Sequence, residues 1–353
     1  AIFQIKSHQD DYARTFFDTT SFTDLVAVVG NSTWEVMNAK KTIQVEWEPF
    51  STYSEARDWG QRQESRFIPG GLESQESQQQ KMAAAAQKPR IVRKDGNPEA
   101  AFAKASKVIE RTFRGPFLAH NCMEPMNFFA HVENGKALCA GPLQKPELTE
   151  IALSNRLGIP LENIHIEMTR LGGGYGRRSY AHWLIEAALI SQEVQAPVHL
   201  IYTREDDMSG GIYRPMYQAT YRAALDRDNN LIGFQVNAGG LVESPLYADR
   251  FPAGAVENYL AEEWTVPSNI TVGSFRAPRS NFIAASEQSF LDEVAEAAGK
   301  DPIEFRLELL QKAKTNPVGE RHDYDPDRLA GVLELVKSKA NWGEKKEGIS
   351  RGV

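Results

Sequence analysis

The sequence has only two cysteines, Cys122 and Cys139, among its 353 residues. Neither belongs to a Cys-x-x-Cys motif, so the chain offers no cysteine cluster for an iron–sulfur centre or a structural zinc ion. The seven histidines are scattered, and no two stand at metal-ligand spacing on one expected helix. We therefore expect no metal ion held by protein ligands.

Long apolar runs and an excess of basic residues are also missing. No apolar segment approaches the roughly 20 residues that cross a bilayer, and residues 1–10 lack the basic flank and apolar centre of a signal peptide. The net charge is −7, whereas nucleic-acid binding usually needs a basic face. We expect no transmembrane segment and no nucleic-acid partner. The chain begins with Ala1, so an upstream export signal stays open and the compartment, cytoplasmic or periplasmic, is undecided.

What is present is ordinary globular composition, with 41% hydrophobic and 25% charged residues and enough length for two or three cores. Hairpin patterns alternate with crossover patterns, which favours an α+β fold. Capping residues and apolar spacing predict helices at 32–41, 98–105, 146–157, 181–194, 287–298, 302 onward and 327–340. Period-two patterns predict strands at 42–47, 108–113, 126–132, 136–140, 164–168, 198–202 (a covered strand), 217–225 and 231–238.

The cysteines flank a predicted hairpin, whose turn is Glu133-Asn134-Gly135. That turn pairs Cys139 with a position near Ala130, far from Cys122. We therefore expect two buried free thiols rather than a disulfide.

Composition predicts three parts of the chain. Residues 1–60 end a small α/β unit, and residues 61–95, rich in Gln, Ser, Glu and Ala, form a linker or surface excursion. Residues 96–353 form a larger mixed-sheet unit with a helical C-terminal part.

The segment 171–178 reads Leu-Gly-Gly-Gly-Tyr-Gly-Arg-Arg, between an expected strand and an expected helix. Glycines allow positive φ and close approach of another molecule, which suits a cofactor lying against main-chain amides. A purely structural strand-to-helix turn is the alternative. The pattern matches neither the dinucleotide-binding fingerprint nor a phosphate loop.

Four motifs together resemble the molybdenum hydroxylase family, which includes the xanthine dehydrogenases and aldehyde oxidases. They are Met123-Glu124-Pro125-Met126, Gly141-Pro142-Leu143-Gln144, the segment 171–178 and Ser274-Phe275-Arg276-Ala277-Pro278. The most similar branch is the large (beta) subunit of isoquinoline 1-oxidoreductase. The resemblance implies the C-terminal part of an α/β hammerhead-like domain at 1–60 and a first molybdopterin-binding domain, within a partial subunit, at 96–353.

The resemblance also implies a cofactor and residue roles. The cofactor is molybdopterin, in its cytosine dinucleotide form, which holds molybdenum through its own sulfurs. Gln144 is the one catalytic residue implied, through an amide hydrogen bond to the apical oxygen on molybdenum, and Tyr175 stands where a phenylalanine is usual. The implied cofactor-binding residues are Gln144, Gly173, Gly174, Tyr175, Gly176, Arg276 and Ala277.

Each role has a plainer alternative. Gln144 is otherwise a surface-loop glutamine, Tyr175 a core aromatic, and Arg276 a partner for a carboxylate on helix 287–298. Arg177 and Arg178 face either a phosphate or solvent.

Departures from the family pattern bear on function. The xanthine-oxidising branch follows the glycines with a lysine and a purine-binding glutamate, whereas this chain has Arg177, Arg178 and Ser179. The substrate implied is therefore an aromatic N-heterocycle or an aldehyde. The family's general-base glutamate and its Gly-Gln-Gly segment are absent, so we expect a partial subunit that is inactive alone and binds no cofactor by itself.

The implied partners are an iron–sulfur small subunit and the rest of the same large subunit. The alternative function is a non-catalytic scaffold module, in which Arg177 and Arg178 bind a partner's carboxylate. Convergence of Gln144, Tyr175 and Arg276 on one place favours the enzyme.

Overall fold

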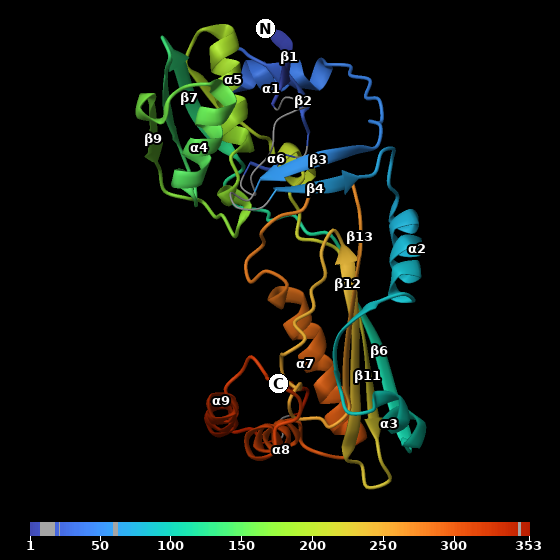
Figure 1. The fold of residues 1–353 in the computed structure, drawn as a ribbon. Helices are drawn as coiled ribbons and strands as arrows, with labels where there is room; N and C mark the ends of the chain where they lie inside the picture. The colour runs from blue at the N-terminus through green and yellow to red at the C-terminus, as the bar shows by residue number, and fades with distance from the viewer. Residues whose placement is uncertain (8–17, 21, 59–62, 345–346) are drawn as a thin grey trace. The chain divides into compact units, whose positions relative to one another are not determined.

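A computed structural model of the chain describes residues 1–7, 18–20, 22–58, 63–344 and 347–353 (Figure 1). These residues form two compact units, each assembled from three separate stretches. Unit 1 contains Ala1–Ser74, Phe117–Pro215 and Pro267–Arg276, and unit 2 contains Gln75–Pro116, Met216–Val266 and Ala277–Val353. The domain boundaries at 1–60, 61–95 and 96–353 remain a prediction.

Unit 1 is built on a four-stranded sheet in the order β10-β7-β8-β9. The β8–β9 pair is parallel and the other pairs are antiparallel. Its strands are β7 Asn127–Glu133, β8 Lys136–Gly141, β9 Ile164–Met168 and β10 Val198–Ile201. Helix α4, Pro146–Leu157, makes the crossover from β8 to β9, and α5, His182–Val194, packs on β7. The core between sheet and helices contains Phe128, Cys139, Trp183 and Leu184.

Smaller elements complete unit 1. They are β1 Ile2–Lys6 paired with β2 Asp24–Val28, α1 Thr33–Thr42, β3 Tyr53–Asp58 paired with β4 Gln63–Ile68, α6 Arg204–Ser209, and the 3₁₀ turns Leu161–Asn163 and Arg177–Ser179. Gly158, at the end of α4, is left-handed with φ 66°, as a helix C-terminal glycine often is.

Unit 2 is a five-stranded sheet in the order β5-β13-β12-β11-β6, in which only β12 and β13 are parallel neighbours. Figure 1 shows α7 along one face of this sheet and α2 and α3 on the other. Tyr221, Phe234 and Phe290 pack ring against ring between the sheet and α7. The elements are α2 Gln75–Ala86, β5 Arg90–Asp95, α3 Pro98–Lys104, β6 Lys107–Gly115, β11 Tyr217–Leu225, β12 Leu231–Leu241, β13 Tyr259–Val266, α7 Ser280–Ala297, α8 Pro302–Thr315 and α9 Pro326–Lys339.

The α+β class is confirmed, as are most of the expected elements. Ser32 caps α1 by accepting a hydrogen bond from the Glu35 N–H, and Asp301 caps α8. The hairpin register places Cys139 opposite Ala130, as predicted. Cys122 and Cys139 are both buried free thiols.

Other expectations about elements are wrong. Residues 43–50 form no strand, because no strand in the described chain pairs with them, and Trp47 stays 66% exposed. Strand β10 is an edge strand with alternate residues exposed, not a covered one. Helix α7 begins seven residues before the expected start, because Phe282 and Ile283 already pack into the core of unit 2. Residues 61–95 include the helix α2, in which only Gln78 and Met82 are buried, and their role as a linker or surface excursion remains a prediction.

None of the helices that the structure describes has the length and apolarity needed to span a bilayer.

Candidate functional site

The glycine segment connects β9 to α5 through an unusual backbone path. Gly173 has φ 106°, Tyr175 has φ 54° and Gly176 has φ 104°, all in the left-handed region. A Cβ added to Gly176 would lie 2.2 Å from the Ser274 carbonyl oxygen. Glycine is therefore required at position 176 for both its φ and its close approach to residue 274.

The Gln144 side chain lies directly against this segment. Its Oε1 accepts hydrogen bonds from the backbone N–H groups of Gly176, at 3.1 Å, and Arg178, at 3.2 Å. Its own backbone N–H donates to the Arg178 carbonyl oxygen at 2.9 Å. A Cβ added to Gly174 would lie 2.6 Å from Oε1. The amide oxygen is thus fixed by two donors, and the Nε2 group is left without an acceptor among the described residues.

Tyr175 and Arg276 meet at the same segment. The Arg276 backbone N–H donates to the Tyr175 carbonyl oxygen at 2.8 Å, and the Arg276 guanidinium carbon lies 5.4 Å from the centroid of the Tyr175 ring. That separation is within the range of a cation–π contact. Tyr175 is 44% exposed, so the alternative that it is a core aromatic is wrong. Gln144, Tyr175 and Arg276 therefore lie around one loop of unit 1.

Ala277 belongs to unit 2, where its carbonyl oxygen accepts a hydrogen bond from the Asn281 N–H at 2.8 Å, at the start of α7. Its predicted contact with a cofactor remains a prediction.

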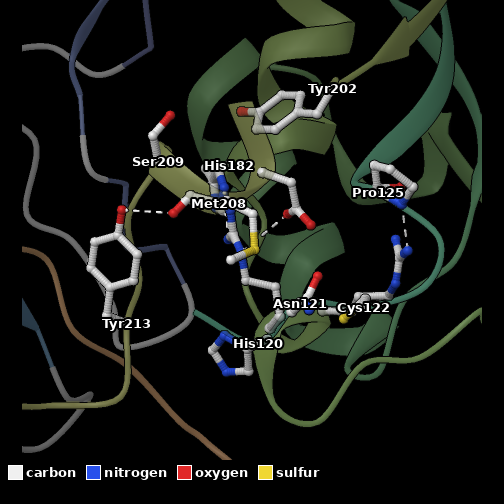
Figure 2. A network of polar contacts seen from close by, with 12 residues as sticks. His120, Asn121, Cys122, Pro125, His182, Tyr202, Met208, Ser209 and Tyr213 are labelled. Atoms are coloured by element: carbon white, nitrogen blue, oxygen red, sulfur yellow. Dashed lines mark hydrogen bonds and ion pairs between the residues drawn. The ribbon is translucent and has the colours of Figure 1, made fainter. Parts of the chain in front are cut away.

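One of the two expectations for Arg178 was that its side chain faces solvent. That expectation is wrong. The side chain is fully buried, and its Nε donates to the Gly173 carbonyl oxygen at 2.8 Å. Its Nη2 donates to the carbonyl oxygens of Glu124, at 2.8 Å, and Pro125, at 3.4 Å, the latter drawn in Figure 2. Nη2 also lies 3.2 Å from Glu124 Oε2. The side chain is thus engaged with the protein's own carbonyl and carboxylate groups.

Arg177 is buried as well and has other partners than Arg178. One of them is His182, which Figure 2 labels in the same network of polar contacts as Pro125. The Arg177 Nη1 lies 3.0 Å from His182 Nε2, and its Nε lies 3.9 Å from Asp207 Oδ1. Both arginines therefore meet acidic groups or carbonyls of the same chain. Neither side chain is therefore exposed to bind a partner's carboxylate, which is the role that the scaffold alternative gives them.

A buried carboxyl lies in the same region as Arg177. Glu186, on α5, accepts a hydrogen bond from the Tyr202 hydroxyl at 2.5 Å. Burial raises the pKa of Glu186 to about 7, against a partial lowering by Tyr202 and Arg177. The carboxyl is therefore poised between its two protonation states near neutral pH.

His120 lies beside the motif that contains Arg276. One ring nitrogen, Nε2, is 2.7 Å from the Ser274 carbonyl oxygen, and the ring lies 4.8 Å from that of Phe275. Burial lowers the pKa of His120 to about 4, so the imidazole is neutral at physiological pH and Nε2 donates to the carbonyl.

Sequence reasoning missed Glu124, His120 and Glu186 as residues of this region. Glu124 belongs to the motif Met123-Glu124-Pro125-Met126, which indicates that it has a role, but nothing in the sequence shows what its side chain binds. His120 and Glu186 carry no sequence signal, because their partners are distant in the chain. In the part of the chain that the structure describes, no three His, Cys, Asp or Glu side chains gather as metal ligands would.

Unit 2 contains a separate cavity of about 550 Å³, beside Glu287 and Arg250. Burial raises the pKa of Glu287 to about 8. None of the site residues predicted from the sequence lines this cavity. The glycine loop of unit 1 is therefore the better candidate site.

Comparisons with known proteins match a long stretch of the chain, which contains this loop, to a family. Residues 82–310, well over half of the chain, match the family described as the molybdopterin cofactor-binding domain. The membrane-bound aldehyde dehydrogenase [pyrroloquinoline-quinone] of Gluconacetobacter polyoxogenes is 27% identical over 71% of the chain and 35% of its own length. The aldehyde oxidoreductase molybdenum-binding subunit PaoC of Escherichia coli K12 is 22% identical over the same shares.

Among solved structures, the quinoline 2-oxidoreductase of Pseudomonas putida 86 shares the fold. It has a TM-score of 0.56 and 17% identity, and it covers 71% of this chain and 35% of its own. The chain thus spans about a third of the length of the relatives that it matches.

Proposed function

Since the chain belongs to the molybdopterin cofactor-binding domain family of the molybdenum hydroxylases, we propose that its glycine loop forms one wall of the cofactor site in a molybdenum-dependent oxidoreductase. The observation that carries this proposal is the Gln144 amide. Its oxygen is held by two backbone N–H groups, so its Nε2 group is presented as a neutral hydrogen-bond donor.

The loop residues fit such a group. The backbone N–H groups of Gly174 and Tyr175 have no acceptor among the described residues. Free amides in a left-handed bend are suited to oxygen ligands or a phosphate. Gly176 differs, because its N–H is already donated to Gln144 Oε1. We therefore assign Gly174, Tyr175 and the Gln144 Nε2 to direct contact, and Gly176 to holding the Gln144 amide.

Bound in this site, molybdopterin would supply a molybdenum centre that accepts two electrons while a water-derived oxygen is added to the substrate carbon. In balance, R–H and water give R–OH, two protons and two electrons. The residues of this chain bind and orient that group. Gln144 would donate a hydrogen bond from its neutral amide group, which neither titrates nor competes for the metal. The Arg276 guanidinium lies over the Tyr175 ring and holds it at the edge of the loop.

We propose an aromatic N-heterocycle, such as an isoquinoline, or an aldehyde as the substrate. The aldehyde relatives and the fold shared with a quinoline 2-oxidoreductase support this range. Arg178, which stands in the purine-binding part of the motif, is buried and bound to Glu124, so it offers no group to a purine. The cytosine dinucleotide form of the cofactor, an iron–sulfur small subunit as electron acceptor and the remaining parts of the large subunit complete the proposal.

The test is the variant Gln144→Ala in the intact large subunit. Loss of one positioned donor typically lowers kcat by about 100-fold or more, so we expect at least that loss with an aldehyde or isoquinoline. Molybdenum content by mass spectrometry and pterin content by fluorescence should also fall.

The matched control is Gln192→Ala, an exposed glutamine on α5 of the same unit, which should leave molybdenum content and kcat unchanged. A Gln144→Ala enzyme with full molybdenum and full turnover would disprove the role. Pyrroloquinoline quinone in place of molybdopterin in the purified wild type would disprove the proposed cofactor.

A further inference from the structure

The ion pair between the buried Arg178 and the partly exposed Glu124 lies against both ends of the glycine loop and against Gln144. We propose that these two residues are positioning residues, which set the orientation of the Gln144 amide through the loop backbone. The functional meaning of that orientation rests on the proposed function.

Arg178 connects to the loop through both its side chain and its backbone. The guanidinium Nε holds the Gly173 carbonyl oxygen at 2.8 Å. The backbone N–H and C=O of the same residue bind Gln144, at 3.2 Å through Oε1 and at 2.9 Å through the Gln144 N–H. A shift of the guanidinium therefore moves the two backbone groups that fix Gln144.

Glu124 fixes the other end of the loop. Its Oε2 accepts a hydrogen bond from the Gly172 N–H at 2.7 Å and lies 3.2 Å from Arg178 Nη2. Its backbone N–H donates to the Gly172 carbonyl oxygen at 3.1 Å, and its Oε1 accepts from Asn127 Nδ2 at 2.9 Å. Both carboxylate oxygens are thus engaged, and they tie the guanidinium to the first glycine of the loop and to the start of β7.

The chemistry of the pair explains why neither residue is easily replaced. The guanidinium presents several N–H donors in a planar fork, so one side chain reaches the Gly173 carbonyl, the Glu124 carbonyl and the Glu124 carboxylate together. A lysine ammonium at position 178 reaches fewer of these at once. A Cβ on Gly172 would lie 2.4 Å from Glu124 Cβ, so the loop and Glu124 are packed without spare room.

The test measures the orientation of Gln144 in the cofactor-free chain by two-dimensional ¹⁵N NMR and amide hydrogen exchange. The Gln144 side-chain signals are identified by their loss in Gln144→Ala. In Arg178→Met we expect these signals to shift and the Gly176 amide to exchange at least 10-fold faster. Arg178→Lys should lie between Arg178→Met and the wild type.

The matched control is Arg170→Met, which removes the same charge from an exposed arginine two residues before Gly172 and should change neither readout. Glu124→Gln is the second variant, chosen because it keeps the side-chain length should Arg178→Met not fold. It should also speed exchange at Gly176. Wild-type Gln144 signals and Gly176 exchange in a folded Arg178→Met or Glu124→Gln protein would overturn the proposal.

The proposed function is tested separately by molybdenum and pterin content in the intact subunit. If Arg178→Met frees Gln144 but the cofactor content stays at the wild-type level, the positioning role stands and the assignment of Gln144 to the cofactor fails. If both change together, both proposals are supported.

Discussion

At the scale of single residues, Arg177 and Arg178 show how little a side chain's chemistry says about its surroundings. They are neighbours in sequence and both are buried, yet Arg177 lies beside His182 and Asp207 whereas Arg178 lies on the Gly173 carbonyl and Glu124. Successive residues of a tight turn point in different directions. One arginine therefore supports the polar network around α5, and the other supports the loop itself.

Glu186 gives a prediction about pH. Its pKa is about 7 in the folded chain because it is buried, against 4.5 for the free side chain. At a pH between these two pKa values, the folded chain keeps a proton on Glu186 that the unfolded chain has released. The free energy of unfolding therefore falls as the pH rises from about 5 to 7, by up to ~1.4 kcal/mol per pH unit. We expect Glu186→Gln to remove this component.

The measurement is urea unfolding at pH 5, 6, 7 and 8, comparing the slope against pH for each protein. Glu193→Gln, at an exposed position of the same helix, should keep the wild-type slope. An identical slope in Glu186→Gln would show that the buried carboxyl is ionised throughout this range.

At the scale of secondary structure, helix ends were predictable because their signals are local. Asp301 Oδ1 accepts hydrogen bonds from the N–H groups of Ile303, at 2.9 Å, and Glu304, at 3.2 Å, and Pro302 occupies the first helical position. The loop 171–178 is the opposite case, because its shape depends on Gln144 and Glu124 from other parts of the chain.

We expect Asp301→Ala to lower the free energy of unfolding by about 1 kcal/mol, because α8 loses its N-cap. The variant also loses the bond from Trp342 Nε1 to Asp301 Oδ2, at 2.7 Å. Asp301→Asn is the matched control, since asparagine caps helices as well as aspartate does. Equal midpoints for the alanine and asparagine variants in urea unfolding would contradict a capping role.

At the scale of the whole molecule, each unit has its own core and is assembled from three stretches of chain. The glycine loop, Gln144 and Arg276 all belong to unit 1, although they are separated by as many as 132 residues of sequence (276 minus 144). The site is therefore a product of how the chain returns to unit 1 after forming strands of unit 2.

We expect the 353-residue chain alone to show no turnover of aldehydes or N-heterocycles with an artificial electron acceptor. The reaction needs a general base within reach of the attacking oxygen, and two carboxylates that contact loop residues, those of Glu124 and Asp207, are engaged. Glu124 binds the Gly172 N–H and Arg178, and Asp207 lies 3.3 Å from Arg204 and 3.9 Å from Arg177. The test is a substrate panel run beside the intact large subunit, and sustained turnover by the chain alone would refute this expectation.

The sequence by itself determined the α+β class, the capped helices, the hairpin register that separates the two cysteines and the motifs that indicate the family. These follow from turns, caps and periodicity, which act between residues close in the chain. Only the tertiary structure decided that residues 43–50 find no partner strand, that Arg177 and Arg178 point inward, and that the Gln144 oxygen is held by Gly176 and Arg178. These depend on which distant segments meet, because a strand needs a neighbouring strand and a buried charge needs a partner that local sequence does not specify.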